Sequence, residues 1–229
     1  MLQKPIIGII GKNEPVTEND LWHRTSVVDE LRYLVVRNNG IAVALLPTEK
    51  SMCLKNLKSD KDLTYQEIED LYRQLDFCDG FILQGGLCSY IYEIEIIKKI
   101  LELDKPILGI CDGFNNMLRA LGTNVIFDET RSHNHFDHNF RHKIHIQTGT
   151  KLYSIVKHTH LNVNSIHSMI ATKELVDPFA TISSYSEDGF VESFELENKK
   201  FAIGLKWHPE LLLEETYVDR LFQKFIARC

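Results

Sequence analysis

The sequence predicts an α/β protein with a doubly wound sheet flanked by helices and an added antiparallel portion in its second half. Short β-branched runs alternate with helical stripes as far as Leu121. Later strand-like runs follow one another across polar turns, and one amphipathic helix ends the chain. Strands joined by helices pair in parallel, whereas strands joined by turns pair in antiparallel fashion, so a mixed sheet is expected.

The first elements form a parallel βαβ unit. Pro5–Gly11 is a β-branched strand ending in glycine, and the segment Trp22–Asn38 repeats apolar residues with the period of a helix. Gly40 follows two asparagines and stops that helix. Ile41–Leu46 is an apolar strand closed by Pro47. A strand, a helix and a second strand in this order pack with right-handed parallel topology.

The alternation then continues through the middle of the chain. Ser51–Asp76 is polar with a few periodic apolar positions, and Gly80–Leu83 is a buried strand that ends near Gly85 and Gly86. A glycine turn at the carboxyl end of such a strand favours a ligand site. The next expected elements are a helix with its apolar stripe at Ile91–Leu101, a strand at Pro106–Ile110 and a helix at Asp112–Leu121.

The second half contains shorter strands that look antiparallel or mixed and extend the parallel core. They are expected at Ile144–Gln147, Leu161–Asn164, Ala180–Tyr185, Val191–Glu195 and Phe201–Lys206, before a helix at Tyr217–Ile226. The sequence has no internal repeat, low-complexity tract or linker, so residues 1–229 are predicted to form a single domain.

Composition limits the classes of partner. The 229 residues carry 26 basic and 32 acidic side chains, for a net charge of −6, with 44% hydrophobic residues. This acidity argues against a nucleic-acid surface and favours small molecules or proteins as partners. The longest apolar run, Ile41–Leu46, is far shorter than the roughly 20 residues of a membrane span. Because the amino terminus lacks a signal peptide, we expect a cytoplasmic protein that does not bind membranes.

Cys111 is the predicted nucleophile. Five cysteines without a CxxC pair indicate reduced thiols, and Gly109-Ile110-Cys111-Asp112-Gly113 runs from an apolar strand directly into a helix. This G-x-C-x-G pattern is typical of a nucleophile elbow, where glycines permit the sharp turn and the helix amino terminus favours a thiolate. The same pattern also suits a buried cysteine between two packing glycines.

Two further segments supply groups that a reactive thiol needs. His208 follows the strand FAIGLKW, and Glu210 comes two residues later, so the histidine can act as a base that the glutamate orients. Taken alone, His-Pro-Glu after a strand is more often a solvated turn than a catalytic pair. The glycine pair after Phe81–Gln84 can direct the amide of Gly86, together with that of Asp112, toward an oxyanion.

These three segments, in this order and spacing, resemble the class I glutamine amidotransferase-like superfamily over nearly the whole chain. The stretches VNSIH, DGFVE and FAIGLKWHPE are similar to the gamma-glutamyl-gamma-aminobutyrate hydrolase type, peptidase family C26. The resemblance implies a flavodoxin-like fold and a Cys-His-Glu triad of Cys111, His208 and Glu210. It also implies that Gly86 and Asp112 stabilise the oxyanion.

The resemblance further implies hydrolysis of a gamma-glutamyl amide through a thioester, with release of glutamate and no cofactor or metal. The small-molecule substrate would be a gamma-glutamyl amine such as gamma-glutamyl-GABA, or a gamma-glutamyl nucleotide amidate. Asn164, Ser165 and His167 become candidate substrate-side residues, although a turn with local hydrogen bonds fits Asn164 and Ser165 equally well. A homodimer is compatible with the sequence.

This sequence departs from the family pattern at three places. Relatives commonly have arginine or a neutral residue after the nucleophile and glutamine four residues after it, where this chain has Asp112 and Asn115. The Asp112 carboxylate is expected to raise the pKa of Cys111, and Asn115, which replaces a contact to the glutamyl group, is one methylene shorter. Leu87-Cys88 also replaces the usual acidic or proline-bearing loop. Substrate identity therefore does not transfer directly.

The segment Arg131–His145 contains five histidines, at positions 133, 135, 138, 142 and 145. Such density can bind a divalent metal, but no cysteine pair accompanies it, and HKIHIQTGTKL fits a strand-and-turn segment of the family that binds no metal. We therefore predict a loop over the active site whose histidines titrate near neutral pH, without a metal.

Two other functional classes remain open. A glutaminase subunit that supplies ammonia to a separate synthetase would share the triad and turn over glutamine when its partner is present. A binding module without catalysis would retain the fold, and Asp112 and Asn115 would then reflect decay of the site. In that module Cys111 would resist alkylation.

Overall fold

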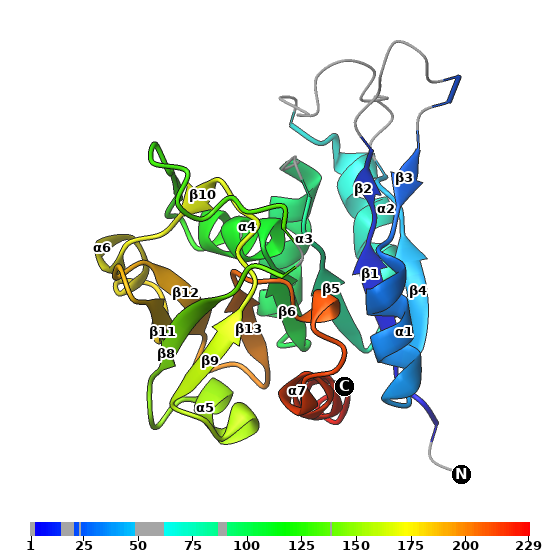
Figure 1. Ribbon diagram of the computed structural model, residues 1–229. Coiled ribbons are helices and arrows are strands. Elements are labelled where there is room, and N and C mark those ends of the chain that lie inside the picture. The colour runs from blue at the N-terminus through cyan, green and yellow to red at the C-terminus, as the bar shows by residue number, and fades with distance from the viewer. Residues whose placement is uncertain (1–2, 15–20, 23, 49–61, 87–90, 138) are drawn as a thin grey trace.

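The computed structural model describes residues 3–14, 21–22, 24–48, 62–86, 91–137 and 139–229, and its centre is one mixed sheet of nine strands. The sheet order is β4-β1-β5-β6-β13-β12-β11-β8-β9, and Figure 1 shows it crossing the molecule from β4 on the right to β8 and β9 on the left. The strands are β1 (Ile6–Ile10), β4 (Ile41–Leu45), β5 (Gly80–Leu83), β6 (Ile107–Ile110), β8 (His142–Ile146), β9 (His160–Val163), β11 (Thr181–Ser186), β12 (Val191–Glu195) and β13 (Ala202–Leu205).

Five of these strands form a parallel core. β1 pairs in parallel with β4 and β5, β5 pairs with β6, and β6 pairs with β13. Numbered along the chain, these strands have the order 2-1-3-4-5, which is the flavodoxin-like order. The remaining pairs, from β13 outward to β9, are antiparallel. The predicted α/β mixed sheet with an antiparallel portion is confirmed.

The prediction for Phe201–Lys206 needs a refinement. This run is expected among the antiparallel or mixed strands, and β13 pairs in both ways: it is antiparallel to β12 and parallel to β6, so it also completes the parallel core. β13 consists of buried residues that are hidden on both faces of the sheet. Its run is therefore continuously apolar, as in the other parallel strands.

Helices cover both faces of the sheet. The longer ones are α1 (Asp29–Arg37), α2 (Tyr65–Asp76), α3 (Ile91–Glu102), α4 (Asp112–Ala120) and α7 (Thr216–Ile226), and the shorter ones are α5 (Lys151–Val156) and α6 (Lys173–Val176). One apolar cluster joins α1, α5 and α7 to the sheet, and another joins α2, α3, α4 and α6 to the opposite face. Among the described residues, no helix is long and apolar enough to cross a membrane.

The helix predicted over Trp22–Asn38 begins later than expected, at Asp29. Thr25–Ser26 forms the short strand β3, paired with β2 (Lys12–Asn13). Val28 donates its backbone N–H to Oε1 of Gln84 at 2.9 Å. Because this contact comes from a distant strand end, helical periodicity alone could not reveal it. Three further short elements also lacked a sequence signal, namely β7 (Ile126–Phe127), β10 (Met169–Ile170) and the 3-10 turn Pro209–Leu211.

Candidate active site

Cys111 lies at a sharp turn between β6 and α4. Cys111 is the residue immediately before the helix. Its backbone angles are φ 52° and ψ −99°, a conformation that residues other than glycine rarely adopt. A Cβ at Gly113 would lie 2.3 Å from the carbonyl oxygen of Leu83, and one at Gly109 would lie 2.6 Å from Sδ of Met117. Both glycines are therefore required by close packing, and the turn has the geometry of a nucleophile elbow.

His208 and Glu210 follow β13 at the same edge of the sheet. His208 Nδ1 lies 2.7 Å from Oε1 of Glu210, whose side chain is buried. The amide of Asn164 holds the backbone of His208 at both ends: its Nδ2 donates to the carbonyl oxygen, and its Oδ1 accepts from the backbone N–H, each at 2.8 Å. Asn164 thus fixes the position of the imidazole from the neighbouring loop.

The charges around Cys111 favour a thiolate. Burial opposes ionisation of this thiol, but the nearby His208 and its hydrogen bond outweigh burial and hold the pKa below its ordinary value. The pKa of His208 lies well above its usual range, since Glu210 and Cys111 outweigh the effect of burial. The Asp112 carboxylate raises the pKa of Cys111, as expected, but the other contributions are larger and the net pKa is lowered.

A pocket of about 540 Å³ opens above Cys111 and collects several of the predicted residues. Its walls are formed by Gly86, Cys111, Asp112, Asn115, Arg119, Asn134, Phe136, Ile166, His167, Ser168, Met169 and His208. Gly86 and Asp112, the predicted oxyanion residues, therefore border the same space as the thiol. The amide of Asp112 belongs to the first turn of α4, where helical N–H groups lack intrahelical partners.

The residues predicted to contact substrate divide into two groups. Asn115 and His167 border the pocket, whereas Asn164 and Ser165 are buried behind it. Ser165 Oγ donates to the carbonyl oxygen of His133 at 2.9 Å, and Asn164 contacts the His208 backbone as described above. Leu87 and Cys88 lie outside the described residues.

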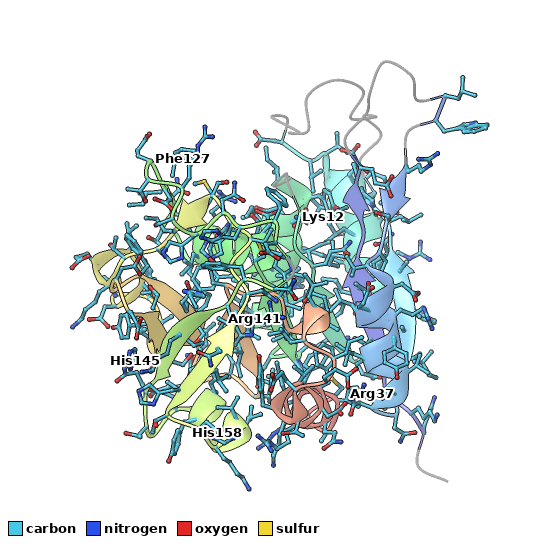
Figure 2. All side chains as sticks on the ribbon, in the orientation of Figure 1. Lys12, Arg37, Phe127, Arg141, His145 and His158 are labelled. Atoms are coloured by element: carbon cyan, nitrogen blue, oxygen red, sulfur yellow. The ribbon has the colours of Figure 1, made fainter. Side chains whose placement is uncertain are left out.

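Sequence reasoning missed Lys12, which forms a buried ion-pair network beside the pocket. Its Nζ donates to Asp112 Oδ2 at 2.6 Å and to Glu93 Oε2 at 2.7 Å, and Asn116 Nδ2 also donates to Glu93 Oε2 at 2.7 Å. Figure 2 labels Lys12 near the upper end of β1, between that strand and the helices beside it. Lys12 therefore offsets the Asp112 carboxylate. Lys12 follows a strand end by two residues, which was the available sequence signal.

Lys206 and Glu192 were also missed. Lys206 is fully buried and donates from Nζ to Oδ1 of Asn115 at 2.6 Å, so it orients one pocket residue. Burial lowers the pKa of Lys206 to about 8 and raises that of Glu192 to about 8. Both residues lie in motifs that the resemblance had already singled out, FAIGLKWHPE and DGFVE, but those motifs assign them no role.

The expectation for the histidine-rich segment is wrong in part. His142 is the first residue of β8, and burial lowers its pKa to about 4, so it does not titrate near neutral pH. His133 is buried, with Nε2 donating to Oδ2 of Asp188 at 2.9 Å. The segment nevertheless borders the pocket through Asn134 and Phe136. His138 lies outside the described residues.

Comparisons with known proteins agree on one family. A model of peptidase C26 matches residues 90–210. The chain is 32% identical to the protein NtpR of Enterococcus hirae over 97% of this chain and 98% of that protein. It is 28% identical to the gamma-glutamyl-gamma-aminobutyrate hydrolase PuuD of Escherichia coli, over 61% of this chain and 59% of the hydrolase.

The fold has a solved counterpart. A glutamine amidotransferase from Thermotoga maritima superposes with a TM-score of 0.60 at 17% identity, covering 99% of this chain and 96% of that chain. The family match and the full-length relative together lead to one conclusion. The chain belongs to the peptidase C26 family, within the class I glutamine amidotransferase-like superfamily.

Proposed function

We propose that the protein hydrolyses the amide bond of a gamma-glutamyl conjugate, with Cys111 as nucleophile. One observation carries the proposal: Cys111 stands at an elbow in contact with His208, whose other ring nitrogen lies 2.7 Å from buried Glu210. A nucleophile, a base and a group that orients the base form the recurring arrangement of acyl transfer. Membership of peptidase C26 and the similarity to PuuD support the gamma-glutamyl substrate class.

The reaction follows from these positions. The Cys111 thiolate attacks the gamma-carbonyl carbon, and the resulting oxyanion lies beside the amides of Gly86 and Asp112. The bond to nitrogen then breaks as imidazolium His208 gives its proton to the leaving amine, which leaves a gamma-glutamyl thioester on Cys111. His208 next removes a proton from water. The hydroxide attacks the thioester, glutamate departs, and the thiolate and imidazolium return.

Asp112 and Asn115 differ from the residues that relatives commonly have at these positions, so we expect the substrate preference to differ there. The Asp112 carboxylate faces Lys12 in the buried network, so this residue presents its backbone amide to the oxyanion. Lys206 donates to Oδ1 of Asn115, and Nδ2 of that amide lies 3.5 Å from Oδ1 of Asp112, so its second N–H is the donor toward an acceptor oxygen of the substrate.

The test is glutamate release from a panel of gamma-glutamyl amines, gamma-glutamyl phosphoramidates and free glutamine. Cys111→Ala should abolish release, and His208→Ala should reduce kcat by at least about a hundredfold. Glu210→Gln should cost less because it removes only the orienting charge. Cys78→Ala is the matched control, since Cys78 is a buried thiol outside the pocket whose pKa is raised to about 11 by burial.

Release that depends on Cys111 from a conjugated amide, with glutamine inert, would support the stand-alone hydrolase. Turnover of glutamine alone would identify an ammonia-supplying subunit instead. A folded wild type that stays silent across the panel, or full activity in Cys111→Ala, would contradict the proposal.

A further inference from the structure

Three side chains from separate segments converge behind the pocket wall. They are His133 from the connection between β7 and β8, His142 at the start of β8, and Glu192 on β12. One nitrogen or oxygen of each lies within 4.8 Å of the other two. His133 Nδ1 is 3.8 Å from Oε1 of Glu192, and His142 Nε2 is 3.9 Å from its Oε2. These separations are too long for hydrogen bonds.

The surroundings decide which atoms of the imidazoles face inward. His133 Nε2 contacts a carboxylate oxygen of Asp188 at 2.9 Å, and a carboxylate accepts hydrogen bonds, so Nε2 carries the proton. His133 Nδ1 faces Glu192, and Ser165 Oγ lies 3.3 Å from the same nitrogen. His167 is arranged similarly: Nδ1 donates to the carbonyl oxygen of Met169 at 3.0 Å, and Nε2 lies 3.7 Å from Oε1 of Glu192.

Three of the inward atoms lack partners among the described residues. Both carboxylate oxygens of Glu192 and Nε2 of His142 are buried without a hydrogen bond among the described residues. Lys206 Nζ donates to Asn115, and no hydrogen bond joins it to Glu192 among the described residues. Buried polar groups in native proteins are normally satisfied, and leaving one unsatisfied destabilises the fold. A cation bound between the Glu192 carboxylate and the facing imidazole nitrogens would satisfy these atoms together.

We propose that His133, His142 and Glu192 bind a divalent transition-metal ion of the zinc type. Two imidazoles and one carboxylate, with a further position open, are a recognised zinc donor set, and bonds of about 2.0–2.2 Å would require the ligands to approach by a few tenths of an ångström. Asp188 would be the outer carboxylate that orients a metal-bound imidazole. This proposal replaces the sequence-based expectation that no metal binds, and it stands apart from the proposed hydrolysis.

The metal would act as a clamp on the pocket wall. It would join the segment that carries Asn134 and Phe136 to β12, while His167 stacks on His133 with ring centroids 5.1 Å apart. His133 and His142 are nine residues apart and have no spacing typical of a metal motif, and Glu192 is remote in sequence. The site therefore becomes visible when the fold brings β8 and β12 together on either side of β11.

The test uses the full chain, stripped with a chelator and titrated with Co²⁺ and then Zn²⁺. We expect one equivalent of Co²⁺ to produce the intense visible bands of a four-coordinate site, and Zn²⁺ to remove them stoichiometrically. Glu192→Gln and His142→Ala should weaken Co²⁺ binding by about a hundredfold or more, and Asp188→Asn by about ten- to a hundredfold.

The matched control is the double variant His145→Ala, His160→Ala. His145 lies on the same strand as His142 but on its opposite face, and it pairs across the sheet with His160. Figure 2 labels His145 at the lower left, away from Lys12. Its removal should leave the Co²⁺ spectrum and stoichiometry unchanged.

Folding of each variant is checked by circular dichroism. His142→Ala should disturb the core less than Glu192→Gln, because His142 is only half-buried whereas Glu192 is fully buried. The wild type alone can overturn the proposal. Weak six-coordinate Co²⁺ bands, or no uptake, would mean that a proton on Glu192 satisfies the cluster. Uptake that survives in folded His142→Ala but disappears in the control variant would assign the metal to the surface histidine pair and would also overturn the proposal.

Discussion

At the scale of single residues, the site depends on the ion pair that the buried Cys111 thiolate and the His208 imidazolium form. Cys111 and His208 each shift the pKa of the other, so that thiolate and imidazolium are both favoured. Glu210 adds a fixed negative charge behind the imidazole, and Asn164 fixes the backbone that carries it. A change at any of these positions should therefore appear in the ionisation of the thiol before it affects the fold.

This pairing predicts how alkylation of Cys111 depends on pH. A lowered pKa keeps a larger fraction of the thiol ionised as pH falls, so the iodoacetamide rate at Cys111 should fall less steeply from pH 8 to pH 6 than that of an ordinary thiol. An ordinary thiol would lose about tenfold per pH unit. His208→Ala should restore that steep dependence. Rates are measured by peptide mass spectrometry with Cys53 and Cys88 replaced by serine.

Two other cysteines are internal references for that measurement. Burial raises the pKa of Cys78 to about 11 and that of Cys229 to about 12, so both should react slowly at neutral pH. A rate at Cys111 that follows the steep line of an ordinary thiol would contradict the ion pair.

At the scale of elements, apolar patterning predicted the parallel core well and the loop-dependent parts poorly. β5 and β6 consist of buried residues and coincide with the apolar runs that predicted them. The helix expected from Trp22 begins at Asp29, because the preceding valines pack in extended form against the core and Gln84 holds Val28. Local periodicity contains no information about such a tertiary contact.

The close approach of α4 to β5 gives a prediction at this scale. Gly113→Ala should lower the free energy of unfolding by about 3 kcal/mol, since the added methyl would meet backbone of Leu83 that cannot move aside. Gly149→Ala is the comparison: its φ of 89° is unfavourable for alanine, but nothing lies within 4 Å of the new atom. We expect about 1 kcal/mol there. Urea unfolding of both variants measures the difference, and equal losses would contradict the packing argument.

At the scale of the whole molecule, the candidate site draws on distant parts of the chain. The sequence predicted the triad and the oxyanion glycine from motifs at strand ends, and the family resemblance implied Asn115 and His167; Cys111, His208, Gly86 and these two residues border one pocket. It could not predict Lys12, Glu93 or the grouping of His133 with Glu192. Those contacts join residues 59 to 81 positions apart or lie between strands whose sheet order is unknown from sequence.

Lys12 provides a test of this long-range organisation. Lys12→Met should lower the free energy of unfolding by about 3 kcal/mol or more, because Glu93 and Asp112 would keep buried charges without their cation. Lys98→Met, which removes an exposed pair with Glu95, should change it little. Thermal and urea unfolding compare the two variants. A similar small loss in both would mean that the buried network contributes little to stability.

The position of β13 has a consequence for synthesis of the protein. This strand lies between β6 and β12 in the middle of the sheet, yet the ribosome makes it after every other strand. Until residues 202–205 emerge, the nascent chain presents two unpaired strand edges, which are surfaces prone to association with other chains. His208 follows these residues by three positions in the chain. Pairing of the last strand would therefore complete the sheet and also place His208 beside Cys111. A chain truncated before Phe201 would thus be aggregation-prone and inactive together.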